Sequence, residues 1–306
     1  MKNSLPKRIF SKGSLLFLNR KWIKILGFTV LALQFSCEKD VNFDFDIEPK
    51  LCLNCVLNPD SMIIAYLSLS QALSKQNHLI PIEEATITLY ENEGFIGYFQ
   101  DNENGNYSMA LYPKTGAKYT ITAEVKGYKT LSASTVVPTY LDILVRKDTI
   151  GFTEYLNMPI FNLDVKLNDP VGKDYYWLYE TRILKGKKYG GNCREINAPF
   201  VDDFNRVLDA DSNYGFTNFL QTRITDEGYD GQLMEFTIPE FLGRDEFQAQ
   251  YFLHADEHYD KYIKTTIINR MKETAELPFY EPIQIYSNIE NGYGIFCSCS
   301  ITVVEL

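Results

Sequence analysis

Two of the three histidines stand four residues apart, in the segment HADEH at residues 254–258. The spacing of His254, Glu257 and His258 formally matches the H-x-x-E-H pattern, in which two imidazoles share a zinc ion and the glutamate activates water. The preceding residues, EFQAQYFLHA, alternate like a strand that ends near His254, and Asp256 stands where a helix N-cap would be. We therefore expect the two histidines on different elements, as surface or loop side chains, and no metal site.

The cysteines offer a second possible chemistry, because Cys52 and Cys55 have the C-x-x-C spacing of redox and zinc sites. The segment KLCLNCVL, however, reads as a strand, which points these two side chains to opposite faces of a sheet. Cys297 and Cys299 share one face of another expected strand, too far apart for an easy disulfide. We expect structural packing, with a four-thiolate zinc site as the alternative. Together with Cys193 these thiols are odd in number, so at least one is free or paired elsewhere.

Other catalytic and cofactor signatures find little support in the chain. Residues 209–215, DADSNYG, place oxygen ligands at alternate positions but lack the terminal glutamate of a strong calcium loop. The sequence contains no G-x-S-x-G, phosphate loop or dinucleotide fingerprint. With 40 acidic residues, neighbouring carboxylates are expected by chance. We predict a protein that is not an enzyme and that binds no cofactor.

The amino-terminal segment predicts the destination of the chain. Residues 1–36 contain seven Lys and Arg and no acidic residue, and they end in the apolar run ILGFTVLALQF. This run is too short to span a bilayer as an anchor, so it predicts a secretory signal peptide. The following Ser36-Cys37 is similar to a bacterial lipobox, in which the cysteine is acylated. We expect lipid on Cys37, followed by an acidic tether over residues 37–48.

Charge excludes one class of partner. Without residues 1–36 the chain has 23 basic and 40 acidic residues, a net charge near −17. Such a surface repels nucleic-acid phosphates and anionic headgroups, and no stripe of Lys and Arg along the sequence compensates. We therefore exclude nucleic acid as a partner.

The hydrophobic pattern predicts a mainly β protein. Residues 49–139 contain seven short alternating segments separated by turn signals such as Asn104-Gly105-Asn106, which predicts an immunoglobulin-like β-sandwich. Residues 140–306 contain longer strands and form a second, β-rich domain. One amphipathic helix is expected near 256–276, and we interpret it as the cover of a sheet face or edge.

Residues 187–229 show little periodicity and predict a long loop region, a common place for recognition. Aromatic side chains on loops are enriched in protein interfaces. The candidate partner-binding residues are Tyr189, Phe200, Phe204, Tyr214, Phe216 and Phe219. The alternative is that these side chains fold back and seal the sheet.

Several segments together resemble a family of Bacteroidota lipoproteins known as domain of unknown function 4249. They are CEKDVNFDFD, LCLNCVLNPD, PIEEATITLYE, GNY, GAKYTITA and, most specifically, the run from Asn288 to Phe296. The chain departs from that pattern at Cys297-Ser298-Cys299. The two Gly and two Asn between Asn288 and Phe296 suit positive-φ turns, so we interpret this run as structural rather than ligand-binding.

The resemblance implies an outer-membrane lipoprotein, often encoded beside TonB-dependent receptors, without an established activity. We accordingly expect a non-catalytic accessory or binding subunit of a TonB-dependent transport complex. The lipid would anchor it to the outer membrane, on either side, the cell surface included. The alternatives are a structural envelope adhesin and a zinc hydrolase using HADEH.

Overall fold

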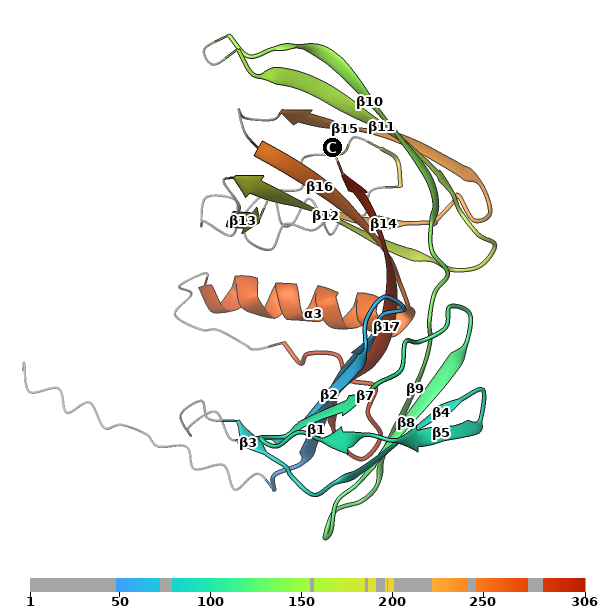
Figure 1. Cartoon of the computed structure of the whole chain (residues 1–306), viewed down its shortest axis with the longest axis vertical. Coiled ribbons are helices and arrows are strands. Elements are labelled where there is room, and N and C mark those ends of the chain that lie inside the picture. Colours follow the sequence, from blue (N-terminus) through green and yellow to red (C-terminus); the bar gives the residue numbers. More distant parts are fainter. Residues whose placement is uncertain are drawn as a thin grey trace, which may run out of the picture. The chain divides into compact units, whose positions relative to one another are not determined.

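The structure is a computed structural model, and its described part is mainly β, as the sequence predicts (Figure 1). It contains seventeen strands in three sheets and one helix, α3 (Glu257–Thr274). In this part no helix is both long and apolar enough to cross a bilayer. The described residues are 48–71, 79–154, 157–184, 187–190, 196, 198–200, 222–241, 246–274 and 283–305. The signal peptide, Cys37 and almost all of the tether lie outside them.

Strands of the first half contribute to two sheets around one core. They are β1 (Leu51–Leu57), β2 (Ile63–Leu69), β3 (Ile80–Pro81), β4 (Thr86–Glu91), β5 (Gly94–Tyr98), β6 (Gln100–Asp101), β7 (Asn106–Met109), β8 (Lys118–Glu124) and β9 (Leu131–Val136). A four-stranded sheet has the order β5-β4-β8-β9, and the others join the large sheet. Alternation along each strand buries Leu53, Leu67, Leu89 and Ile121 in a single apolar cluster, which draws on both sheets.

Strands of the second half are longer. They are β10 (Asp142–Phe152), β11 (Pro159–Asn168), β12 (Tyr175–Leu184), β13 (Lys187–Gly190), β14 (Thr222–Thr225), β15 (Leu233–Phe241), β16 (Glu246–Ala255) and β17 (Tyr293–Glu305). A three-stranded sheet has the order β10-β11-β15. Its buried face meets the large sheet in a second apolar cluster, which contains Leu163, Ile238, Leu178 and Phe252.

The last strand, β17, connects the two halves. Its first part pairs in parallel with β1, from Cys52 opposite Tyr293 to Leu57 opposite Ser298. Its second part pairs antiparallel with β16. The large sheet therefore runs β13-β12-β16-β17-β1-β2-β7-β6 and includes strands from both predicted domains.

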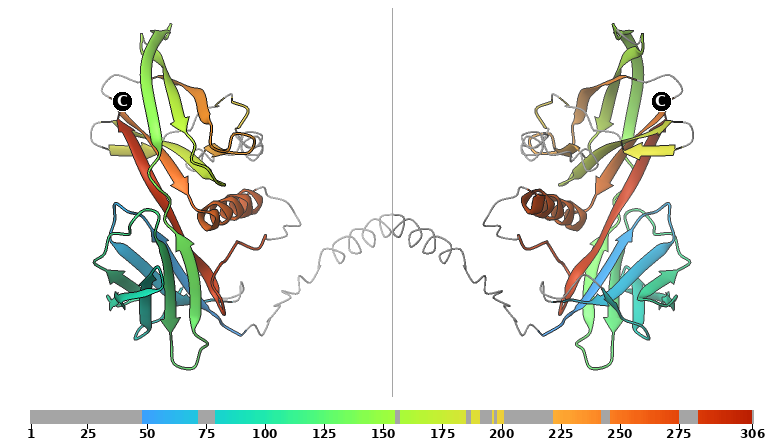
Figure 2. Two further views of the ribbon diagram at one scale, coloured as in Figure 1. Left: turned by 90° about the vertical axis from the view of Figure 1, so that its right-hand side faces the viewer. Right: turned by 90° about the vertical axis from the view of Figure 1, so that its left-hand side faces the viewer.

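Local chemistry explains where α3 begins. The Asp256 carboxylate accepts a 2.7 Å hydrogen bond from the backbone N–H of Tyr259, as an N-cap does. Figure 2 shows the helix beside β16 and β17, which it contacts. One face packs Tyr259, Ile263 and Ile267 against the large sheet in a third apolar cluster. The predictions of the helix, of its cap and of its role as a sheet cover are confirmed.

The run Asn288 to Phe296 leads the chain into β17. The Asn288 side chain accepts from the Phe296 N–H at 2.9 Å and donates to the Phe296 carbonyl at 2.7 Å. Asn291 has φ +63° and Gly294 has φ +108°. A Cβ on Gly294 would lie 2.1 Å from the Leu53 carbonyl oxygen. The structural interpretation of this motif is thus confirmed at these positions.

Candidate functional site

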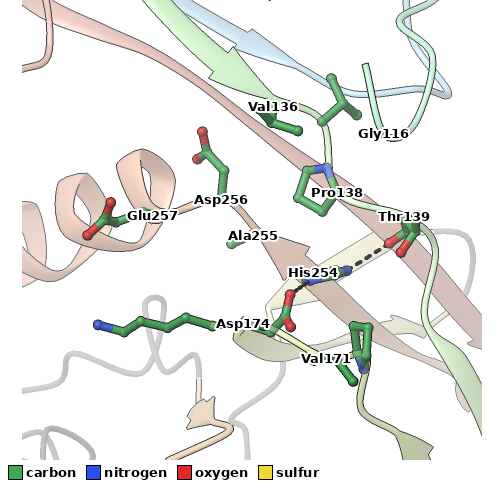
Figure 3. A pocket seen from close by; sticks show the side chains of 14 residues that line it. Gly116, Val136, Pro138, Thr139, Val171, Asp174, His254, Ala255, Asp256 and Glu257 are labelled. Carbon is green, nitrogen blue, oxygen red and sulfur yellow. Dashed lines mark hydrogen bonds and ion pairs between the residues drawn. The ribbon is translucent and has the colours of Figure 1, made fainter. Parts of the chain in front are cut away.

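A groove of about 400 Å³ lies where the chain crosses from β9 to the second half (Figure 3). Four segments form its walls: the end of β9 and the linker after it, the loop before β12, the junction of β16 with α3, and the loop between β7 and β8. Its lining residues are Gly116, Val136–Thr139, Pro170–Asp174 and His254–Glu257. The groove therefore collects part of the HADEH segment that the sequence singled out.

His254 is buried at the end of β16 and bridges two of these segments. Its Nδ1 lies 2.8 Å from the Thr139 carbonyl oxygen, and its Nε2 lies 2.6 Å from an Asp174 carboxylate oxygen. A carbonyl oxygen accepts only, so Nδ1 carries a proton, and the contact with Asp174 needs a second. Both ring nitrogens of His254 are thus hydrogen-bonded to groups within the fold.

His258 lies on another element, the first turn of α3, where its Nδ1 is 2.8 Å from the Tyr286 hydroxyl. Glu257, the acid/base of the hypothetical zinc site, pairs with Lys261 at 2.8 Å. The prediction that the two histidines occupy a strand and a helix is confirmed. His254 is buried, however, and the expectation of a surface or loop position was wrong for it, because two acceptors inside the fold compensate its polar ring.

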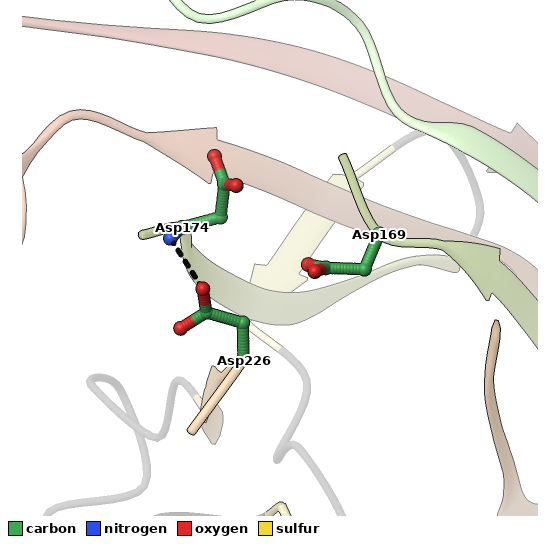
Figure 4. Close-up of side chains that lie close together, drawn as sticks. All are labelled: Asp169, Asp174 and Asp226. Atoms are coloured by element: carbon green, nitrogen blue, oxygen red, sulfur yellow. Dashed lines mark hydrogen bonds between the residues drawn. The ribbon is translucent and has the colours of Figure 1, made fainter. Parts of the chain in front are cut away.

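Three aspartates beside the groove form a cluster that sequence reasoning missed (Figure 4). One carboxylate oxygen each from Asp169, Asp174 and Asp226 lies within 4.8 Å of the other two. Oxygen ligands at this spacing could hold a hard cation such as Ca²⁺. Each side chain also has protein partners: Asp169 accepts from the Gly231 N–H at 2.8 Å and from the Tyr176 hydroxyl, and Asp226 accepts from the Asp174 N–H at 3.0 Å.

Burial raises the pKa of Asp169 above its ordinary value, and the neighbouring Asp174 and Asp226 raise this pKa further. The sequence signal that could have indicated the cluster is DEGYDG, residues 226–231. This segment lies between two strands and contains acidic residues interspersed with glycines. The possible calcium loop at residues 209–215 lies outside the described residues. Across the described part, these aspartates are the one group of three or more potential ligands close enough to share a metal.

The described cysteines are Cys52, Cys55, Cys297 and Cys299, and all are free thiols. Burial raises the pKa of Cys55 and of Cys299 to about 12, and it raises the pKa of Cys52 and Cys297 as well. Because the thiolate is the reactive and metal-binding form, these residues behave as apolar side chains. Cys193 lies outside the described residues.

Among the candidate partner-binding residues, only the side chain of Phe200 is described. It is buried in the second apolar cluster, edge-on to Tyr229 and Phe236 at centroid distances of 5.3 and 5.6 Å. For Phe200 the structure shows the inward packing that was the alternative. The backbone of Tyr189 lies in β13, and the remaining candidates, Phe204, Tyr214, Phe216 and Phe219, lie outside the described residues.

Comparison with known proteins places the chain in a family. No curated protein matches it. Residues 38–304 match the family described as Domain of unknown function (DUF4249), which covers the chain from just after Cys37 to the end of β17. The chain therefore belongs to the DUF4249 family.

Proposed function

We propose that this protein is a lipid-anchored outer-membrane lipoprotein and serves as a non-catalytic binding subunit of a TonB-dependent transport complex. The leader that ends at Cys37 supports the anchor, and it directly precedes the matched family region. The absence of catalytic signatures in the sequence supports a binding role. A structural envelope adhesin is the alternative.

The observation that carries the binding role is the outer edge of β10. Among the described strands, β10 pairs only with β11, so its other edge offers backbone donors and acceptors along eleven residues. Leu144, Ile150 and Phe152 are 65, 58 and 60% exposed on this strand. Protected edges are the rule in monomeric proteins, whereas an open edge with exposed apolar side chains toward both of its ends suits strand addition by a partner.

Two finer proposals accompany this one. Residues 49–139 form an immunoglobulin-like sandwich, an idea supported by the single core that their two sheets share. The partner surface includes the candidate aromatic residues of the 187–229 region other than the buried Phe200. They are Tyr189, Phe204, Tyr214, Phe216 and Phe219.

A detergent pull-down of the native lipoprotein tests the binding role, with mass spectrometry of the recovered proteins. We expect a TonB-dependent receptor to co-purify, and we expect the triple change Leu144→Lys, Ile150→Lys, Phe152→Lys to abolish it. Phe95→Lys with Tyr98→Lys is the matched control, because these side chains are similarly exposed on β5, another edge strand. Recovery of no β-barrel would favour the adhesin, and equal recovery with the β10 variant would place the contact elsewhere.

The anchor has its own test. Cys37→Ala removes the acylation site, so the variant should leave the membrane fraction after a salt wash. If the variant still sediments with the outer membrane, the assignment of lipid to Cys37 is wrong.

A further inference from the structure

A second groove, of about 730 Å³, lies where the chain enters β1 from the tether. It collects residues that are far apart in the sequence: the beginning of β1, the turn between β8 and β9, and the loop before β17. In Figure 1 the beginning of β1 and the β8–β9 turn both lie at the lower end of the picture. The lining residues are Glu48–Leu51, Gly127–Lys129, Asn291 and Gly292.

Lysine and tyrosine side chains lie in this groove and beside it. The Lys50 ammonium lies 5.0 Å from the centroid of the Tyr293 ring, a cation–π contact. The β8–β9 turn adds Lys126, Tyr128 and Lys129, and all five side chains are exposed. We call these five residues the tether-side patch.

Hydrogen bonds fix the backbone beneath the patch. The Tyr128 N–H donates to the Val125 carbonyl at 3.1 Å, which closes the β8–β9 turn. The Asn291 side chain donates to the Thr130 carbonyl at 2.9 Å and ties the loop before β17 to the same turn. The patch is therefore presented on a closed turn and a strand start rather than on a free chain end.

We propose that the tether-side patch docks on phosphate-bearing lipid headgroups of the membrane to which the chain is anchored. This inference rests on the proposed lipid on Cys37. Glu48 follows Cys37 by eleven positions, and such a segment spans at most about 40 Å when fully extended. The covalent tether thus keeps this groove near the headgroups.

The chemistry of the patch fits that surface. Tyrosine rings with a polar tip partition to the headgroup region, and lysine stems extend an ammonium toward phosphate. Glu48 lines the groove, and the exposed Glu124 and Glu290 are close to patch residues in the sequence. These glutamates balance the charge of the lysines, so the surroundings are nearly neutral. Charges beyond the Debye length of about 8 Å are largely screened at physiological salt. Local lysines can therefore act although the chain without residues 1–36 has a net charge near −17.

Vesicle flotation of residues 37–306 carrying Cys37→Ala, a chain without the leader and without lipid, tests the patch. We expect this protein to float with vesicles of phosphatidylcholine and phosphatidylglycerol, and less with phosphatidylcholine alone. The added changes Lys50→Glu, Lys126→Glu, Lys129→Glu should weaken binding by about a hundredfold or more. The control is Lys118→Glu, Lys147→Glu, Lys166→Glu, which alters the net charge equally at exposed sites elsewhere.

Each outcome bears on the proposal. Loss of binding in the patch variant with retention in the control supports it. Equal loss in both variants, or no binding of the parent to anionic vesicles, overturns it. Competition by inorganic phosphate at low concentration would reveal a free-anion site and also overturns the membrane assignment. Failure of the lipid anchor would appear separately, in the fractionation of Cys37→Ala.

Discussion

Gly294 shows how one residue can determine the junction between two strands. Its φ of +108° is unfavourable for any side chain, and its α-carbon faces the backbone of β1. Nothing larger than hydrogen fits there, because a Cβ would overlap the carbonyl oxygen of Leu53. The parallel pairing of β17 with β1 therefore depends on this glycine.

We predict that Gly294→Ala lowers the free energy of unfolding by about 3 kcal/mol or more, through backbone strain and steric overlap. Urea denaturation followed by circular dichroism measures this change. Gly151→Ala is the matched control, since no atom lies within 4 Å of its Cβ and its φ is not positive. Its effect should stay within about 0.5 kcal/mol. Similar stability of the two variants would contradict the role given to Gly294.

At the scale of elements, α3 is attached to the large sheet by a buried ion pair as well as by apolar packing. The Arg223 guanidinium of β14 donates two hydrogen bonds to Asp260 of α3, at 2.6 and 2.9 Å. The Trp177 indole N–H donates to the same carboxylate at 3.0 Å. All three side chains are buried, so the loss of the carboxylate charge would be costly.

Asp260→Asn should destabilise the protein by roughly 3–5 kcal/mol, because it removes the negative charge that faces the buried Arg223 guanidinium. Thermal or urea unfolding measures this. Glu257→Gln on the same helix is the control, since Glu257 forms an exposed pair with Lys261 and should cost less than about 1 kcal/mol. Equal losses would show that α3 is held by its apolar face alone.

At the scale of the whole molecule, β17 makes the two halves one cooperative structure. The same strand completes the first core beside β1, where Phe296 is buried, and pairs with β16 in the second half. β1 and β17 are more than 200 positions apart. The chain therefore loses the entropy of bringing them together before their pairing can stabilise it, so this pairing forms late in folding. Each half therefore lacks one strand of its sheet until β17 has paired.

We expect residues 46–139 expressed alone not to fold stably, because β1 then lacks its partner β17. The measurement is a two-dimensional amide NMR spectrum of the fragment beside that of residues 46–306. A poorly dispersed spectrum of the fragment is the expected result. A well-dispersed spectrum would show that the first half is an autonomous domain.

Local patterns made much of the secondary structure predictable. Alternation along KLCLNCVL and EFQAQYFLHA correctly predicted β1 and β16, and Asp256 correctly predicted the beginning of α3. The asparagines and glycines before β17 correctly predicted a turn. These features depend on neighbours within a few residues, so the sequence contains their physical cause directly.

Tertiary structure alone decided which distant segments meet. Alternation of apolar and polar residues predicts which face of a strand is buried, but it does not predict which strand pairs with it. The position of β17 between β1 and β16 could therefore not be predicted from the sequence pattern. The same holds for Arg223 opposite Asp260 and for Asp169 beside Asp226, whose separation in sequence exceeds 35 residues in each case. The burial of Phe200 in the core could not be predicted either. An isolated aromatic residue in an irregular segment has no periodic pattern that would indicate burial, so its position depends on the sheet against which it packs.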